Sequence, residues 1–204
     1  KIVEDVKTKD MSNALMTIYN LGNIFPIYSN ENGNFLHFMA AKNQTKVVEQ
    51  LLDVGADIES VMPTCKHTPL IVAEQNDNLQ CVKLLVSRGA RVNALTWKGN
   101  TAFGSSIDKN QSDIALYLLE SGADTSIEGS MGSFLSLAYA KKMYEVIDKL
   151  LGKNPDLEGK KFNDLTFLEA VCRDGKFDMV DKLLAQGAKA TSKALEYALK
   201  DGEE

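Results

Sequence analysis

A unit of about 33 residues recurs along the chain, and this repetition restricts the fold more than any other feature of the sequence. One apolar position returns at intervals of 34, 33, 32 and 33 residues, at Leu36, Leu70, Phe103, Leu135 and Leu168. A second marker follows the same interval, at Gly22, Gly55, Gly89, Gly122 and Gly187, with Asn154 in the fifth of six places. A period of this length is typical of a solenoid, in which each unit packs against its neighbours and the chain forms one elongated body.

The clearest unit, residues 68–91, predicts two short helices. Thr68 suits the N-cap position because its hydroxyl can accept a hydrogen bond from a free amide of the first turn, and Pro69 suits the first helical position. A second apolar run follows and ends at Gly89, which can adopt the left-handed conformation that closes a helix. We therefore expect each unit to contain two antiparallel helices.

The repeated residues resemble those of the ankyrin repeat family. Segments 34–37, 68–71 and 101–104 read NFLH, TPLI and TAFG, which are similar to the TPLH motif of that family. The end of the unit is kept more closely, since residues 50–57 and 117–124 read QLLDVGAD and YLLESGAD. The resemblance covers nearly the whole chain and implies an all-α solenoid of antiparallel helix pairs with finger-like turns.

The same register divides a single domain, residues 1–204, into about six repeats plus a C-terminal capping helix. Residues 1–32 are expected to form a degenerate N-terminal repeat, whose charged first helix suits a solenoid end that faces water. The remaining repeats are expected at 33–65, 66–98, 99–131, 132–163 and 164–190. Residues 191–204 are expected to form the capping helix and a tail, with Ser192 as the N-cap and with the core covered by Ala194, Leu195, Tyr197, Ala198 and Leu199.

Charge and composition argue against two classes of partner. The chain has 28 acidic and 23 basic residues, a net charge of -5, whereas binding to a nucleic-acid backbone needs a basic face. No apolar run is long enough to cross a membrane, so membrane insertion is not expected.

Three cysteines without disulfide or metal-ligand spacing favour a reducing compartment, the cytoplasm. A signal peptide removed before Lys1 would leave a periplasmic or secreted location open.

No set of residues has catalytic or metal-binding spacing, so we expect neither an enzyme nor a cofactor. His37 occupies the last place of the TPLH-like motif, where the resemblance implies hydrogen bonds between neighbouring turns, and His67 is a turn or contact residue. Cys81 and Cys172 fall at core positions and are expected to behave as small hydrophobic residues. Cys65 lies in a turn and is a candidate for an exposed thiol.

The resemblance places partner binding on the concave face, the surface made by the turn tips and the first helix of each unit. Trp97, the only tryptophan, and Phe162 fall at turn tips, where the core does not need them and where large aromatic side chains are typical interface anchors. An alternative is that Trp97 packs back on the neighbouring turn. The predicted partner-binding residues are Trp97, Lys98, Asn100, Phe162, Asn163, His67, Gln75, Asn76, Asp108, Lys109, Arg173 and Asp174.

These features predict a non-catalytic scaffold that binds a partner protein and is monomeric on its own. The mixed charges around Trp97 suit a protein surface better than a lipid or nucleic-acid surface. Two other functions stay open. The first is that of a dedicated enzyme inhibitor or immunity protein, or of a secreted microbial effector. The second is that of the interaction domain of a larger enzyme. Tight one-to-one inhibition of one enzyme would favour the inhibitor.

Overall fold

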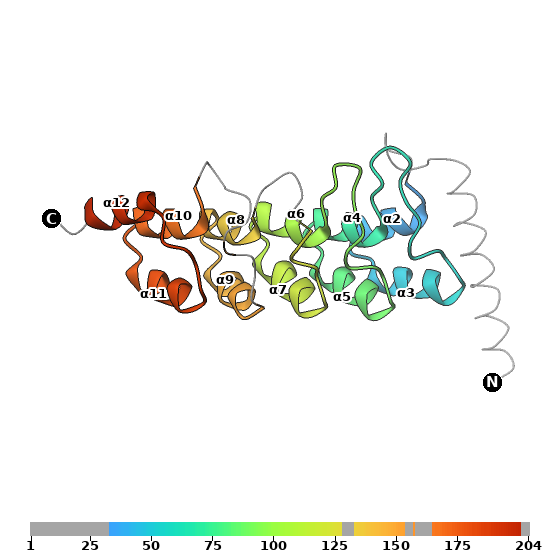
Figure 1. Cartoon of the computed structure of the whole chain (residues 1–204). Coiled ribbons are helices and arrows are strands. Elements are labelled where there is room, and N and C mark those ends of the chain that lie inside the picture. Colours follow the sequence, from blue (N-terminus) through green and yellow to red (C-terminus); the bar gives the residue numbers. More distant parts are fainter. Residues whose placement is uncertain (1–32, 128–132, 154–156, 158–164, 201–204) are drawn as a thin grey trace, which may run out of the picture.

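The helices of the chain form two rows that run side by side (Figure 1). The structure is a computed structural model that describes residues 33–127, 133–153, 157 and 165–200. The inner row, uppermost in Figure 1, contains α2 (Phe35–Ala41), α4 (Pro69–Gln75), α6 (Ala102–Asp108), α8 (Phe134–Ala140) and α10 (Phe167–Arg173). The outer row contains α3 (Thr45–Asp53), α5 (Leu79–Ser87), α7 (Ser112–Glu120), α9 (Tyr144–Leu151) and α11 (Phe177–Ala185). The last helix, α12 (Ser192–Lys200), extends the inner row beyond α10.

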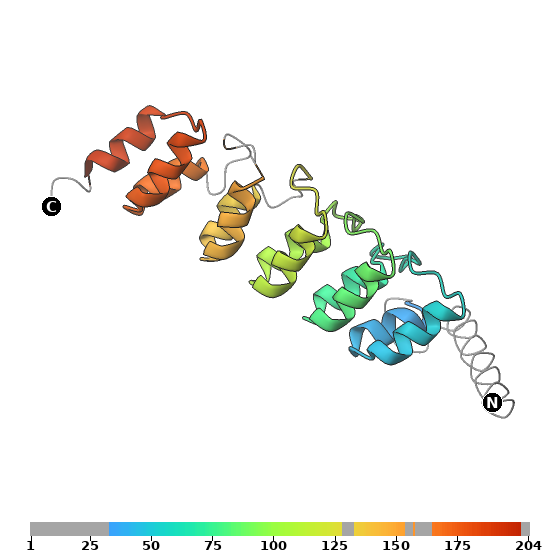
Figure 2. The ribbon, with the colours of Figure 1, turned by 90° about the horizontal axis from the view of Figure 1, so that it is seen from below.

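Neighbouring pairs stack in chain order, so the expected solenoid of helix pairs is confirmed over the described residues. Each inner helix contacts its own outer helix and the inner helix of the next unit. Figure 2 shows the outer helices lying side by side in one layer, from blue to red. The turns at 54–68 and 88–101 project beyond the inner row (Figure 1). The degenerate repeat predicted at 1–32 lies outside the described residues.

N-cap side chains fix where the inner helices begin. Thr68 Oγ1 accepts a hydrogen bond from the amide of Ile71 at 3.4 Å, and Thr101 Oγ1 accepts from the amide of Gly104 at 3.1 Å. Pro69 is the first residue of α4, where its missing N–H has no partner to lose. The helix start predicted from Thr68 and Pro69 is therefore confirmed.

Left-handed residues follow the inner helices α2 to α10 and the outer helices α3, α5, α7 and α11. The outer helices α3, α5, α7 and α11 are followed by glycines with φ between 91° and 94°, namely Gly55, Gly89, Gly122 and Gly187. This confirms the predicted glycine closures, while Asn154 and Gly22 lie outside the described residues. A second left-handed position, which the sequence reasoning missed, joins each inner helix to its outer helix. It is occupied by Asn43, Asp77, Asn110, Lys142 and Gly175, with φ between 55° and 64°.

One continuous apolar core runs through the stack. The recurrent position that reveals the repeat is buried in each described unit, with at most 4% of the side chain exposed, at Leu36, Leu70, Phe103, Leu135 and Leu168. Phe103 and Phe134 carry the core from α6 to α8 through an edge-to-face contact with ring centroids 5.0 Å apart. The period of about 33 residues in the sequence therefore marks the position that each described unit buries in the core.

The C-terminal helix differs from the prediction in its cap and in the face that it buries. Thr191, not Ser192, is the N-cap, because Thr191 Oγ1 accepts from the amide of Ala194 at 3.1 Å. Ala194 is 3% exposed, but Leu195 is 56% and Leu199 is 70% exposed. Residues three and four apart share a helix face, so α12 packs on α10 through the stripe that begins at Ala194 and leaves Leu195 and Leu199 in solvent. The prediction that these two leucines cover the core was wrong.

Candidate functional site

Hydrogen bonds tie the projecting turns to one another. His37 Nε2 lies 3.0 Å from the carbonyl oxygen of His67 in the next turn, which confirms the role expected for His37. Burial lowers the pKa of His37 to about 4, so the ring is neutral at physiological pH. In the following turn, Arg91 Nε donates to Glu59 Oε2 at 2.6 Å. These contacts join α2 to the turn at 54–68, and that turn to the turn at 88–101.

Trp97 stands at a turn tip with 61% of its surface exposed. Its backbone is held firmly, since the Trp97 amide donates to the carbonyl oxygen of Cys65 at 3.1 Å and the amide of Thr96 donates to the carbonyl oxygen of Asn100 at 2.9 Å. The ring has one close charge, the Lys98 ammonium at 5.3 Å from its centroid. The indole therefore keeps most of its surface in solvent. It projects from a rigid backbone, with Lys98 beside it and Asn100 closing the turn.

A hollow between α2 and α4 brings together three of the predicted binding residues. His67, Gln75 and Asn76 line a cavity of about 210 Å³. Gln75 Nε2 lies 3.3 Å from His67 Nε2, and Asn76 Nδ2 donates to the carbonyl oxygen of Val72 at 2.8 Å. Met62 and His67 of the turn at 54–68 also line the hollow, and this turn is hydrogen-bonded to the Trp97 turn through Cys65. The three residues and the Trp97 tip can therefore contact one partner.

The predicted charged residues lie at the C-terminal ends of the inner helices and form ion pairs. Asp108 Oδ1 lies 3.3 Å from the Lys141 ammonium of the next unit. Lys109 Nζ lies 3.3 Å from Glu74 Oε1 of the preceding unit. These charges link adjacent units as well as facing solvent. Arg173 and Asp174 lie at the equivalent place on α10, and Phe162 and Asn163 lie outside the described residues.

Glu74 is the residue that sequence reasoning missed. Its side chain is fully buried, Ser105 Oγ donates to its Oε1 at 3.0 Å, and its Oε2 has no partner. Burial raises the pKa of Glu74 to about 7, against the attraction of Lys109. The repeat register indicates that this position is buried. Glu74 lies four residues after Leu70, just as Cys172, which is expected in the core, lies four residues after Leu168. A carboxyl at this core position is thus visible from the sequence register alone.

The described residues contain no group of three or more side chains arranged to hold a metal ion. Cys81 and Cys172 are buried as expected, and burial raises the pKa of Cys81 to about 11. Cys65 is half-buried, with its Sγ 3.8 Å from Met62 Sδ. No helix in the described ranges has the length and apolar character that a bilayer crossing needs.

Comparison with known proteins identifies the repeats. The family model for ankyrin repeats (3 copies) matches residues 36–128. The mouse B-cell lymphoma 3 protein homolog is 34% identical over 119 residues, which are 58% of this chain and 26% of that protein. A putative ankyrin repeat protein of fowlpox virus is 34% identical over 115 residues, 53% of this chain and 34% of that protein. The chain thus spans about a quarter to a third of the length of these relatives.

A solved structure has the same architecture. The ankyrin repeat domain of human ASB11 superposes with a TM-score of 0.60 at 23% sequence identity, covering 82% of this chain and 83% of that domain. The likeness confirms the fold that the sequence period predicted.

Proposed function

Because the chain carries ankyrin repeats, we propose that it is a non-catalytic scaffold that binds a partner protein through its concave face. Ankyrin repeats are generally protein-interaction modules, and the paired helices and projecting turns of this chain offer an extended surface of that kind. The binding site proposed here centres on Trp97 and includes Lys98, His67, Gln75 and Asn76.

The observation that carries this proposal is the exposed indole on a fixed backbone. Trp97 contributes little to the core at 61% exposure, yet its turn is closed by hydrogen bonds on both sides. Tryptophan is among the residues most enriched at the energetic centre of protein interfaces. A rigid backbone also reduces the conformational entropy lost on binding. The arrangement suits an anchor that enters a pocket of the partner.

Affinity capture from the native cell tests the proposal, with wild-type protein beside Trp97→Ala and Leu184→Ala. Leu184 is a matched control, because it is 44% exposed and lies on the outer helix α11. A protein recovered with the wild type and Leu184→Ala, but lost with Trp97→Ala, supports binding at the turn tips. Equal recovery with all three would move the site elsewhere on the solenoid and refute the proposal.

The narrower function of an enzyme inhibitor is tested with the same captured partner. If the partner is an enzyme, one equivalent of the wild-type chain should abolish its activity and Trp97→Ala should not. A partner without enzymatic activity would exclude the inhibitor function and leave the scaffold function as the proposal.

A further inference from the structure

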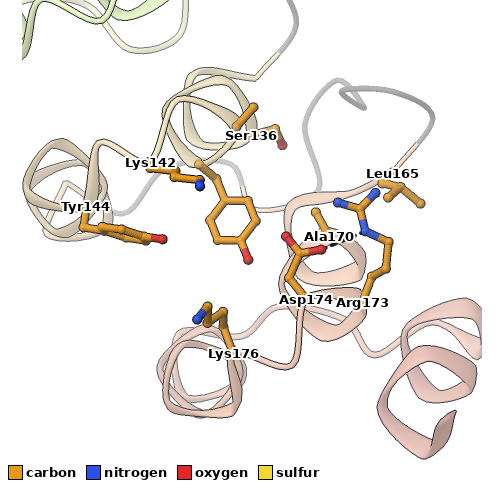
Figure 3. A pocket seen from close by; sticks show the side chains of 10 residues that line it. Ser136, Lys142, Tyr144, Leu165, Ala170, Arg173, Asp174 and Lys176 are labelled. Atoms are coloured by element: carbon orange, nitrogen blue, oxygen red, sulfur yellow. Dashed lines mark hydrogen bonds and ion pairs between the residues drawn. The ribbon is translucent and has the colours of Figure 1, made fainter. Parts of the chain in front are cut away.

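A polar pocket opens between α8 and α10, away from Trp97. Its volume is about 410 Å³, and Figure 3 shows the side chains that line it. Lys142 lies in the joint between α8 and α9 and Tyr144 begins α9, whereas Arg173 and Asp174 come from the end of α10. Lys176 completes the ring from the start of α11. Two neighbouring repeats therefore build one pocket.

The pocket is basic although the chain is acidic. Lys142, Arg173 and Lys176 face a single carboxylate, Asp174, which leaves an excess of two positive charges where the whole chain has a net charge of -5. Neither lysine makes an ion pair with another described residue. The pocket thus holds cationic groups whose counter-charge the described part of the chain does not supply.

Asp174 holds Arg173 in place. Arg173 Nε donates to Asp174 Oδ1 at 2.9 Å, and the Tyr139 hydroxyl also donates to this carboxylate. The bond from Arg173 lowers the pKa of Asp174, so that the carboxylate stays ionised. Arg173 makes no other hydrogen bond to the described residues, so its two terminal nitrogens remain available as donors. A guanidinium oriented in this way is suited to an oxyanion.

Lys142 occupies a position that disfavours lysine. It has φ 59°, at the left-handed joint where the other described units have Asn43, Asp77, Asn110 and Gly175. Asparagine, aspartate and glycine tolerate this conformation, whereas a longer side chain there costs roughly 1 kcal/mol or more. The backbone conformation therefore does not favour lysine at this joint, and the side chain places an ammonium at the pocket.

Ser136 supplies a buried polar group at the wall of the pocket. Its side chain is 4% exposed, and its hydroxyl has no hydrogen-bond partner among the described residues. A buried hydroxyl without a partner is unfavourable unless a ligand or water satisfies it. The Ser136 oxygen itself has almost no exposed surface, so the neutral side chain that the pocket offers to a ligand is Tyr144, which is 47% exposed.

We propose that this pocket binds a phosphorylated side chain of the partner protein. The inference rests on the proposed function and adds the chemistry of one contact. A phosphorylated residue carries a charge of about -1.5 to -2 at neutral pH and three acceptor oxygens. The excess of two positive charges and the donors of Arg173, Lys142 and Lys176 match those properties. A carboxylate side chain carries one negative charge and would neutralise only one of the two excess positive charges.

Titration of the full chain followed by amide NMR tests the proposal. The probes are N-acetyl phosphoserine amide, N-acetyl phosphotyrosine amide, N-acetyl glutamate amide and inorganic phosphate. At least one phosphorylated amino acid should bind saturably, with shifts at Lys142 and Arg173, and at least tenfold more tightly than the other two probes. Glutamate or inorganic phosphate binding as tightly, or no saturable shift at the pocket, would overturn the proposal.

Variants separate the pocket from the fold. Lys142→Asn should weaken binding of the phosphorylated probe at least tenfold without lowering the thermal midpoint, because asparagine suits the left-handed joint. Lys46→Asn on α3 makes the same charge change at an exposed site and should leave binding unchanged. Lys176→Gln, outside the joint, should also weaken binding. Unchanged binding in Lys142→Asn and Lys176→Gln would overturn the assignment.

The two proposals fail independently. Capture of a partner that depends on Trp97, with no probe bound at the pocket, would leave the scaffold function standing and remove this inference. If the phosphorylated probe binds at Lys142 but capture of the partner does not depend on Trp97, the pocket assignment stands and the binding site proposed at Trp97 is refuted.

Discussion

Glu74 makes the stability of the solenoid depend on pH. The carboxyl lies between α4 and α6 with no exposed surface, and it has two partners on α6 and its cap, Ser105 and Lys109. One oxygen, Oε2, has none. Burial outweighs the attraction of Lys109 and raises the pKa from 4.5 to about 7. The folded chain therefore binds a proton at this site more tightly than the unfolded chain does.

The size and sign of the effect follow from that pKa. One pKa unit corresponds to about 1.4 kcal/mol, so a pKa of about 7 in place of 4.5 corresponds to about 3 kcal/mol. A raised carboxyl pKa stabilises the folded state fully below pH 4.5. That contribution is lost as the pH rises towards 7, where the buried carboxylate forms. Between pH 4.5 and pH 7, ionisation of Glu74 should therefore lower the free energy of unfolding of the wild type.

Substitution of Glu74 by Gln isolates this contribution. The free energy of unfolding is measured by urea titration from pH 4 to pH 8, and the difference between wild type and Glu74→Gln is plotted against pH. That difference should fall by about 3 kcal/mol between pH 4.5 and pH 7, since all other titrating groups cancel.

An exposed carboxylate provides the control. The hydrogen bond from Lys149 lowers the pKa of Glu120, so Glu120→Gln should not remove the decline that Glu74→Gln removes. A wild-type minus Glu74→Gln difference that stays flat from pH 4.5 to pH 7 would refute the reasoning. It would show that Lys109 holds Glu74 ionised in the folded chain.

Two further predictions test the local structure. Thr68→Ala removes the bond to the amide of Ile71 and should lower the free energy of unfolding by about 1 kcal/mol, measured by urea titration. No change would mean that the cap is dispensable. The double variant Leu195→Ser, Leu199→Ser should change that free energy by less than about 0.5 kcal/mol, because both side chains are exposed. A loss above about 2 kcal/mol, which is typical of buried leucines, would show that Leu195 and Leu199 cover the core as the sequence predicted.

Local signals in the sequence predicted the fold because each of them acts within one unit. Thr68 and Pro69 begin α4, and Gly89 follows α5 with φ 92°, as their intrinsic preferences require. The interval from Leu36 to Leu70 repeats because the same position of each unit is buried in the core. Capping, closure and core spacing therefore needed no tertiary information.

The errors arose where contacts between units decide the outcome. Five apolar residues on the last helix suggested a broad buried face, but α12 packs on α10 and buries only the stripe that begins at Ala194. Lys142 gave no warning of its left-handed backbone, because lysine rarely adopts that conformation. The pocket that it lines joins Lys142 to Arg173, which are 31 residues apart in the sequence. Only the stacking of α8 and α10 brings these charges together.

The exposed Trp97 was predicted for a physical reason that held. A tryptophan at a turn tip has no core to enter, so its exposure follows from the register alone. What it binds does not follow, because the complementary surface belongs to the partner. The partner-binding residues therefore stay predictions.

The affinity of the captured partner for wild-type and Trp97→Ala protein, measured by isothermal titration calorimetry beside the thermal midpoint of each, tests the central claim most directly. The account predicts that Trp97→Ala weakens binding by roughly 30-fold or more, corresponding to about 2 kcal/mol, while the thermal midpoint is unchanged. Intact affinity with a substantially lowered thermal midpoint would contradict it, since Trp97 would then serve the fold and not the interface.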